Sequence, residues 1–471
     1  MISCLLAFAC VSRLDAILDD SKLQGAWVSA TVCTLGGETL YERNPGIRMM
    51  PASNEKLASV AFAFAKLGPE HRFQTRFWKV REGVRVQAEG DPLLTYAQLK
   101  AAGAKLGIGK DTAVYVHQPF RAQIGPAWEW DDLPNKYAAP VSGLTVDRGS
   151  FEIWAEDGKA FFLPESYGTR TVRVTEEGKP SVRYDPSQRV ALLYGGLPKA
   201  RTRLDTLALP APDRAAVAAL GGLYAVGGDV PAREPDFVIE SPPLAEIAHE
   251  CLTKSDNNLA EMLLLAAAGK EGPLGDAPYD VATKRLGAFL EGMVGVAKGD
   301  WVPQDGSGLS RHNMVASRGL ARVLVWAAKQ SWNKSWESSL ASSSVGTLSG
   351  RLKGTGFRGK TGTLHLASAL SGYVEDGKGR TLVVSLVFNH FLCSSAEARG
   401  IQDTFVTELQ KEFLDGTPFA LRRTYESPHA HAELGTVAGH WIPGSVHHPL
   451  AARERHDGRA QPDHALLPAQ G

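Results

Sequence analysis

The sequence lacks an excess of charge of either sign. Lys and Arg total 51 and Asp and Glu total 51, so no net field attracts nucleic acid or acidic lipid. A membrane-spanning start is also missing, because Arg13 and Asp15 interrupt the apolar beginning long before roughly 20 apolar residues accumulate. We therefore expect no nucleic-acid partner and no transmembrane helix, and we expect partners to be recognised by local sites.

Cysteine is scarce and shows no spacing typical of metal sites or disulfide-rich domains. The five cysteines, expected to be mostly buried thiols, are Cys4, Cys10, Cys33, Cys251 and Cys393. Seven histidines gather after Thr417 without hydrophobic periodicity, so residues 417–471 are predicted to be a disordered tail and not a metal site. Residues 1–23 are a candidate signal segment that lacks the usual basic start; a mispredicted or truncated start is the alternative.

Three short strings stand out from this background. They are Ser53-Asn54-Glu55-Lys56, Ser255-Asp256-Asn257 and Lys360-Thr361-Gly362. A Ser-x-x-Lys pattern is expected roughly once in a chain of this length, and a second copy, Ser331 to Lys334, precedes no apolar helix of useful length. The other two tripeptides are each expected on the order of 0.1 times per chain. Their occurrence in this order favours serine acyl-transfer chemistry over chance.

The first string begins a predicted helix. Strands over 28–32 and 38–43 predict a hairpin, and Ser53 then opens a helix that stops at Gly68. Because Lys56 lies three positions after Ser53, both side chains leave the same face. This indicates a nucleophile, Ser53, and its base, Lys56, whose pKa would be lowered by burial and by a second cation such as Lys360. The alternative is that Ser53 only caps the helix.

The second string falls between predicted helices over 243–252 and 258–268. At such a junction polar side chains can face a cleft. We expect Ser255 to relay protons, and Asn257 to bind the amide of the substrate and to orient Lys56. An ordinary helix cap at Ser255 or the residue after it is the alternative.

The third string begins an antiparallel meander, in which Lys360 and Thr361 supply donors for an anionic group. Gly362 lets a ligand backbone approach the strand, and the backbone N–H groups of Ser53 and Thr363 are candidates for an oxyanion hole. A surface strand that happens to carry a lysine is the alternative. The meander is predicted from strands at 360–363, 369–374 and 381–389.

The three strings, their order and their surroundings resemble the penicillin-binding D-alanyl-D-alanine carboxypeptidases of the low-molecular-mass class C type, serine peptidases of bacterial cell-wall metabolism. The resemblance covers roughly residues 24–415. It implies that Ser255, Asn257, Lys360 and Thr361 bind substrate and relay protons as assigned above. Beyond the strings it rests on Pro51–Leu57, Gly90–Leu93, Trp128–Pro140, Asp305–Asn313 and Gly359–Val374.

Fold and domain organisation follow from the spacing and from the resemblance together. Roughly 200 positions separate Ser53 from Ser255, and residues 71–240 read largely as short strands and turns. The resemblance implies an α/β (α+β) serine transpeptidase/β-lactamase-like core, made of residues 24–70 and 241–416, with an inserted β-rich region between the first and second catalytic motifs.

The function that the resemblance implies is a serine D-alanyl-D-alanine carboxypeptidase outside the cytoplasm, in the periplasm or cell envelope. Ser53 would cleave peptidoglycan stem peptides through an acyl-enzyme and would be trapped by β-lactam antibiotics. Cleavage of cross-links as an endopeptidase stays open, as does the oligomeric state. No cofactor and no metal are expected, since Ser and Lys supply the nucleophile and the proton transfer. The alternatives are a serine β-lactamase and a catalytically silent wall-binding protein.

Other polar and aromatic residues are candidates for shaping the substrate pocket. Arg311 is expected either to bind an acidic group of the substrate or to form a structural ion pair. The inserted region contributes a cluster that could line a pocket for the peptide stem, Tyr137 included, although such clusters are more often core packing with buried hydrogen bonds. Its members are Asp91, Trp128, Trp130, Asp132 and Tyr137.

Overall fold

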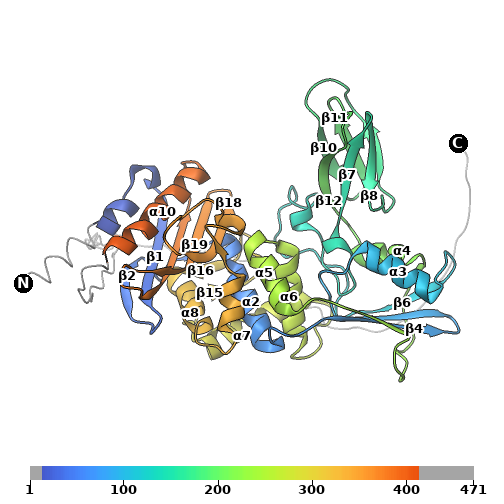
Figure 1. Cartoon of the computed structure of the whole chain (residues 1–471), viewed down its shortest axis with the longest axis horizontal. Coiled ribbons are helices and arrows are strands. Elements are labelled where there is room, and N and C mark those ends of the chain that lie inside the picture. Colours follow the sequence, from blue (N-terminus) through green and yellow to red (C-terminus); the bar gives the residue numbers. More distant parts are fainter. Residues whose placement is uncertain (1–12, 413–471) are drawn as a thin grey trace, which may run out of the picture. The chain divides into compact units, whose positions relative to one another are not determined.

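A computed structural model describes residues 13–412 (Figure 1). The predicted signal segment up to residue 12 and the predicted tail over 417–471 lie outside the described residues. Among residues 13–412 no helix is both long and apolar enough to cross a membrane.

An antiparallel six-stranded sheet joins the two ends of the described chain. The predicted meander is confirmed, and its last strand matches the predicted range of residues 381–389. The N-terminal strand β1 pairs along its whole length with β20, so chain segments more than three hundred positions apart share one sheet. In sheet order the strands are β17 (Ala341–Ser342), β18 (Arg358–Leu364), β19 (Ala367–Glu375), β20 (Thr381–Asn389), β1 (Trp27–Thr34) and β2 (Thr39–Arg43).

One face of this sheet is covered by the last helix, α10 (Ser395–Glu412), and by the residues that precede β1. Leu14, Leu18 and Leu23 are buried there, and the Tyr41 hydroxyl donates to Asp15 at 2.7 Å. The folded unit therefore begins well before the predicted boundary at residue 24. Residues 13–18 form a short helix, and Leu14 and Leu18 lie on its buried face.

The opposite face packs on a cluster of helices around α2 (Glu55–Leu67). This helix ends as predicted at Gly68, and its residues from Glu55 to Phe64 are all buried. A helix buried on every side must satisfy its polar groups internally, which makes Glu55 and Lys56 notable. The surrounding helices are α5 (Leu244–Lys254), α6 (Asn257–Gly269), α7 (Pro278–Phe289), α8 (Ser317–Ala327) and α9 (Asn333–Ser339), with a small sheet of β15 (Trp301–Val302), β16 (Met314–Ala316) and β3 (Arg48–Met49).

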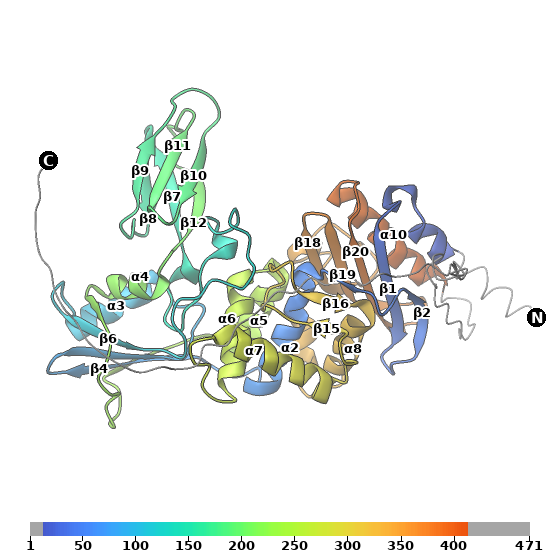
Figure 2. The same cartoon turned by 180° about the vertical axis from the view of Figure 1, so that it is seen from behind.

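The chain between α2 and α5 builds a separate hydrophobic core with three sheets (Figure 2). The five-stranded sheet runs β13 (Leu223–Ala225), β6 (Ala113–His117), β5 (Gly83–Ala88), β4 (Gln74–Val80), β14 (Phe237–Glu240). The two smaller sheets run β12 (Thr202–Ala208), β7 (Ser150–Glu156), β8 (Lys159–Leu163) and β10 (Ser181–Asp185), β11 (Val190–Tyr194), β9 (Arg170–Arg173). The abundance of strands agrees with the β-rich character predicted for residues 71–240.

Two helices in this region were not predicted, α3 (Tyr96–Leu106) and α4 (Pro212–Leu220). The start of α3 carries a reciprocal capping box, in which Thr95 and Gln98 bond each other's backbone N–H groups. That Thr-x-x-Gln pattern before an apolar run is a start signal readable from the sequence.

Candidate active site

Ser53 lies on η2 (Ala52–Asn54), the single turn that leads into α2. It is not the helix cap, because Asn54 occupies that position and makes no side-chain capping bond. The preceding Ala52 is fully buried with φ of 46°, a conformation that costs a non-glycine residue energy and that clusters at functional sites. The turn thus presents Ser53 on a constrained backbone.

Two glycines let neighbouring segments approach this turn closely. A Cβ placed on Gly308 would lie 1.8 Å from the carbonyl oxygen of Ala52, and one placed on Gly362 would lie 2.7 Å from that of Pro51. The third string, on β18, therefore packs directly beside the turn that carries Ser53. Any larger residue at Gly308 or Gly362 would push the turn away.

The amine of Lys56 is the centre of the site. Its Nζ lies 2.8 Å from Ser53 Oγ, 2.7 Å from Asn257 Oδ1 and 2.7 Å from the carbonyl oxygen of Ser307, and the side chain is fully buried. The last two oxygens can only accept hydrogen bonds, whereas the serine hydroxyl can also donate. A neutral amine that donates to both obligate acceptors therefore turns its lone pair towards Ser53.

The orientation of Asn257 is fixed from the other side. Its Nδ2 donates to the backbone carbonyl of Tyr137 at 2.9 Å, which leaves Oδ1 facing Lys56. The hydrogen bond that Lys56 Nζ donates to Asn257 Oδ1 is the geometry expected if Asn257 orients Lys56. The contribution of Tyr137 comes from its backbone; its hydroxyl donates to Asp132 at 2.8 Å, and its side chain is partly exposed.

Lys360 joins the second and third strings. Its buried Nζ donates to Ser255 Oγ and to the carbonyl of Thr361, both at 2.8 Å. Ser255 ends α5 in the left-handed region with φ of 59°, a second strained backbone position in the site. The side chain of Thr361 is bonded to Thr347 at 2.7 Å.

Burial shifts the pKa of both lysines downwards. For Lys56 loss of hydration lowers the pKa, and Coulomb interactions with Cys251, Asp305 and Glu261 oppose the shift. For Lys360 the pKa is held well below its usual value. Burial is the largest cause, and repulsion from Lys56 is the second. Burial is the main cause of the lowered pKa of both lysines.

Three buried carboxyl groups behind Lys56 support the site. Both oxygens of Glu261 accept backbone N–H groups, from Gly306 and Ser307, at 2.8 Å, so Glu261 positions the carbonyl that receives Lys56. Burial raises the pKa of Glu261 to about 8. The Asp305 carboxylate accepts hydrogen bonds from the backbone N–H groups of residues 308 and 310 and from the indole N–H of Trp128. Glu55 accepts from the indole of Trp301 at 2.8 Å, and burial raises its pKa.

The supporting residues were not assigned from sequence. Glu261 carried one readable signal, a single acid inside the apolar run of α6. A buried acid needs a partner, so the position was recognisable as a polar site although its partner was not.

Arg311 forms an ion pair with Glu129 and also donates to the carbonyl of His365 at 3.2 Å. Of the two expectations for Arg311, the ion pair is therefore present. In the aromatic and acidic cluster, Trp128 is tied to Asp305, whereas Trp130 is 79% exposed and packs into no core. The cluster is thus divided between support of the site and the surface.

Thr363 follows Gly362 on β18 and pairs with Ser368 of β19.

Within residues 13–412 no group of three or more His, Cys, Asp or Glu side chains is arranged to hold a metal ion.

Comparison with known proteins places this geometry in context. The family model described as D-Ala-D-Ala carboxypeptidase 3 (S13) matches residues 10–181 and 229–412. A D-alanyl-D-alanine carboxypeptidase of Actinomadura sp. (strain R39) is 30% identical over 467 residues, with 84% of this chain and 83% of that protein covered. The carboxypeptidase DacB of Haemophilus influenzae is 25% identical over 417 residues, with coverages of 77% and 85%.

A solved structure shares the fold. Penicillin binding protein 4 (dacB) from Haemophilus influenzae superimposes with a TM-score of 0.70 at 22% identity, covering 85% of this chain and 98% of that chain. The predicted core of mixed helices and sheet is thereby confirmed.

Proposed function

Since the chain belongs to the D-Ala-D-Ala carboxypeptidase 3 (S13) family, we propose that it cleaves the bond between the two terminal D-alanines of peptidoglycan stem peptides through an acyl-enzyme on Ser53. The observation that carries the proposal is the position of the Lys56 amine, 2.8 Å from Ser53 Oγ and between two obligate acceptors. This arrangement supplies a base at the nucleophile without a metal or a histidine.

The reaction proceeds in two steps. Ser53 Oγ attacks the carbonyl carbon while its proton moves to Lys56 Nζ, and the backbone N–H groups of Ser53 and Thr363 receive the negative charge on the oxygen. The C–N bond then breaks, and the proton reaches the departing nitrogen through Ser255, which is bonded to Lys360. Water adds to the ester in the second step and restores Ser53. Lys360 and Thr361 bind the terminal carboxylate of the substrate, and Gly362 gives it room.

The discriminating experiment is mass spectrometry of purified cell-wall fragments before and after incubation with the protein. Loss of one alanine from a pentapeptide stem is the expected result, and scission of a bridge between stems would add endopeptidase activity. If every fragment mass stays unchanged, the protein does not hydrolyse these substrates. That result would favour the alternative of a catalytically silent wall-binding protein.

A serine β-lactamase would share the acylation chemistry, so the fate of the adduct decides between the two. We propose that a β-lactam acylates Ser53 and leaves slowly, since the chain belongs to a family of carboxypeptidases. Intact-mass spectra should show a penicillin adduct that persists after removal of free drug. If the penicillin adduct is instead hydrolysed rapidly, so that the free enzyme returns, the result would favour the β-lactamase. Since the proposed substrate is the cell wall, we also propose that the protein acts in the periplasm or the extracytoplasmic cell envelope.

The pH dependence of acylation follows from the lowered pKa of Lys56. Lys56 acts as a base only when neutral, so acylation is expected to be lost as the pH falls through its folded pKa and to be gained as the pH rises. Because burial lowers this pKa from 10.5, the acid limb should lie below that of an ordinary lysine. The check is the second-order rate constant for acylation by a chromogenic β-lactam as a function of pH. A rate that stays constant down to the range where ordinary carboxyl groups titrate would contradict the assignment of Lys56.

A further inference from the structure

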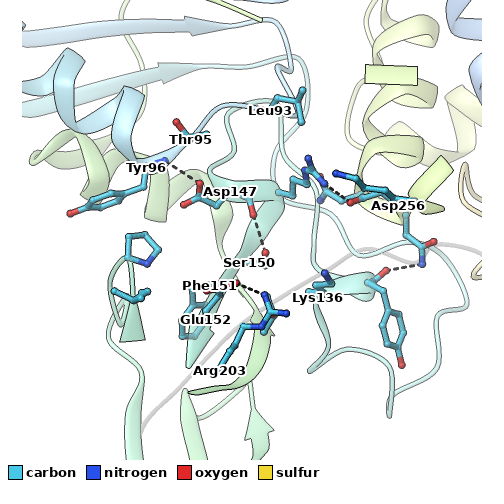
Figure 3. A pocket seen from close by; sticks show the side chains of 18 of the residues that line it. Leu93, Thr95, Tyr96, Lys136, Asp147, Ser150, Phe151, Glu152, Arg203 and Asp256 are labelled. Carbon is cyan, nitrogen blue, oxygen red and sulfur yellow. Dashed lines mark hydrogen bonds and ion pairs between the residues drawn. The ribbon is translucent and has the colours of Figure 1, made fainter. Parts of the chain in front are cut away.

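A cavity of about 870 Å³ lies beside the second string (Figure 3). Ser255, Asp256 and Asn257 border it on the side of the helices, and Tyr96, Lys136 and Phe151 border it on the side of the inserted region. Ser53, Lys56 and Lys360 are not among its lining residues. It is therefore a space next to the reaction centre and not the reaction centre itself.

A single side chain, Asn257, connects the cavity with the proposed base, Lys56. Asn257 lines the cavity and also bonds Lys56 at 2.7 Å. The proposed reaction engages only the last two residues of a polymeric substrate, so the remainder of that substrate has to lie along the surface next to this site. A space of this volume is large enough for several peptide residues.

The charged groups of the cavity are matched, with one exception among the cations. Of the acids, Glu152 pairs with Arg203 at 2.9 Å and Asp256 with Arg148 at 2.9 Å. Asp147 accepts the N–H of Tyr96 at 3.2 Å, and burial raises its pKa. Lys254 pairs with Glu250 at 2.5 Å.

Lys136, on the short turn η3 (Lys136–Ala138), is exposed, and its side-chain ammonium makes no hydrogen bond or ion pair with any residue among 13–412. We propose that this cavity is a binding subsite for a carboxylate of the substrate beyond the two terminal D-alanines, with Lys136 as its ammonium partner; the inference rests on the proposed function. An unpaired cation beside apolar and aromatic walls fits an acidic peptide segment.

Two stem pentapeptides that differ only in whether the carboxylate of the acidic second residue is free or amidated form the test. Wild-type kcat/KM is expected to favour the free acid about fivefold, the size typical of a partly exposed ion pair. Lys136→Met should reduce that ratio to about one. Lys159→Met, an exposed lysine on β8 that does not line the cavity, is the matched control and should keep the wild-type ratio.

The carboxylate has two sources, the cleaved stem and a neighbouring stem joined to it. If the preference appears only with a cross-linked pair whose neighbouring stem carries the free acid, the cavity binds the neighbour. The proposal is overturned if wild type does not discriminate, or if Lys136→Met discriminates as wild type does. Calorimetric titration of the same peptides into Ser53→Ala gives this comparison without turnover. Failure of the cavity proposal is therefore distinguishable from failure of the proposed hydrolysis.

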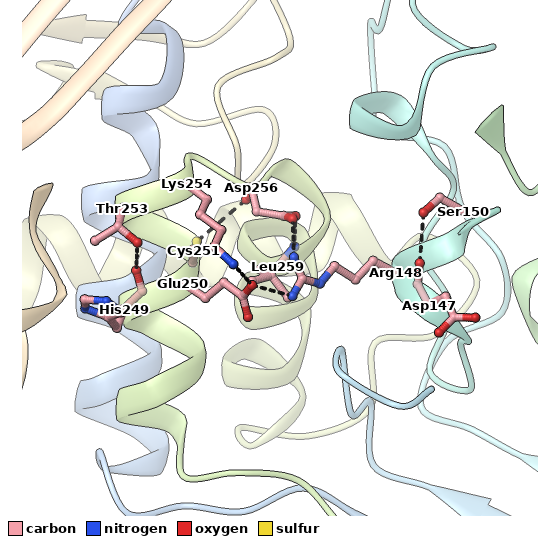
Figure 4. Close-up of polar contacts among 10 residues, drawn as sticks. All are labelled: Asp147, Arg148, Ser150, His249, Glu250, Cys251, Thr253, Lys254, Asp256 and Leu259. Atoms are coloured by element: carbon pink, nitrogen blue, oxygen red, sulfur yellow. Dashed lines mark hydrogen bonds and ion pairs between the residues drawn. The ribbon is translucent and has the colours of Figure 1, made fainter. Parts of the chain in front are cut away.

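A different observation carries a second inference, the contact of Arg148 with the second string (Figure 4). Arg148 lies on η4 (Asp147–Gly149) of the inserted region with φ of 56°, and its guanidinium bonds Glu250 at 2.7 Å and Asp256 at 2.9 Å. Asp256 in turn caps α6 by accepting the N–H of Leu259 at 3.1 Å. The residue between Ser255 and Asn257 is thus held from outside the core.

We infer that Arg148 is a positioning residue for the second string. It fixes Asp256 and, through the backbone on either side, Ser255 and Asn257. A guanidinium that bridges two carboxylates suits this task, because its planar donors set direction as well as charge.

In Arg148→Met the rate constant of acylation by a short D-Ala-D-Ala peptide or a β-lactam is expected to fall about tenfold, with KM changed little. Arg148→Lys should recover part of the rate, since it restores the charge without the fork. Arg233→Met is the control; it removes an exposed Arg–Asp pair at 2.8 Å elsewhere in the inserted region and should acylate as wild type does. An unchanged rate in Arg148→Met, or an equal loss in Arg233→Met, overturns the inference. If Arg148→Met does not fold, Arg148→Lys decides. A wild-type rate in Arg148→Lys would leave no role for the guanidinium that bridges the two carboxylates.

Discussion

Replacing Ser53 by alanine is expected to abolish covalent labelling by a fluorescent penicillin and to reduce peptide hydrolysis by a factor on the order of 10⁴ or more. No other described hydroxyl is bonded to the Lys56 amine, so no residue within 13–412 can take over the attack from the same position. The measurement is the intact mass after incubation with a β-lactam, together with turnover of a peptide ending in two D-alanines.

The sequence offers a matched control for this change. Ser331 begins the second Ser-x-x-Lys copy and is exposed, so Ser331→Ala should be labelled as wild type is. Ser53→Ala should unfold within a few degrees of wild type, since a single hydroxyl at the start of α2 is lost. An adduct that persists in Ser53→Ala would move the nucleophile to another residue.

The parts of the site that sequence could predict are those with a side-chain signature and a local structural context. The strands β18, β19 and β20 could be placed because strand-like stretches are separated by turn residues along the chain. Helix α2 could be placed because its apolar residues recur at helical spacing and Gly68 ends it. The three-residue spacing predicted that Ser53 and Lys56 meet, and Lys56 Nζ lies 2.8 Å from Ser53 Oγ. Asn257 was expected to orient Lys56, and the two side chains are hydrogen-bonded at 2.7 Å.

The parts that sequence could not predict are contacts made by backbone groups or across long separations. The carbonyl of Tyr137 fixes Asn257 and the carbonyl of Ser307 receives Lys56, and a carbonyl is present at every position of any sequence. Arg148 reaches Asp256 across 108 positions, so no local pattern marks the pair.

These contacts change how the inserted region is understood. Trp128, Tyr137 and Arg148 each bond a residue of the site or of the string next to it, respectively Asp305, Asn257 and Asp256. The segment from 128 to 148 therefore supports the reaction centre in addition to any contact it makes with substrate. We therefore expect substitutions in this segment to affect the proposed chemistry of the core.

Replacing Lys56 by methionine is expected to lower kcat/KM for acylation by a factor on the order of 10³, within the range found for loss of a general base. Methionine keeps the length and fills the same buried space, so the change removes the amine and little else. The acid limb of the pH profile should disappear with it, because the group whose ionisation sets the limb is gone. Residual acylation should rise steadily with hydroxide concentration.

Lys66→Met separates this effect from the loss of any lysine on the same helix. Lys66 lies in the last turn of α2, where it pairs with Glu271 at 2.5 Å in a partly exposed position. Such a pair contributes about 0–1 kcal/mol, so Lys66→Met should keep the wild-type rate and pH profile. If Lys56→Met retained an acid limb at the same pH, the base would have to be another group facing Ser53. Since the buried carboxyl groups Glu261 and Asp305 bond backbone N–H groups and not the serine, none of them is placed to act in that way without moving the loop from 305 to 310.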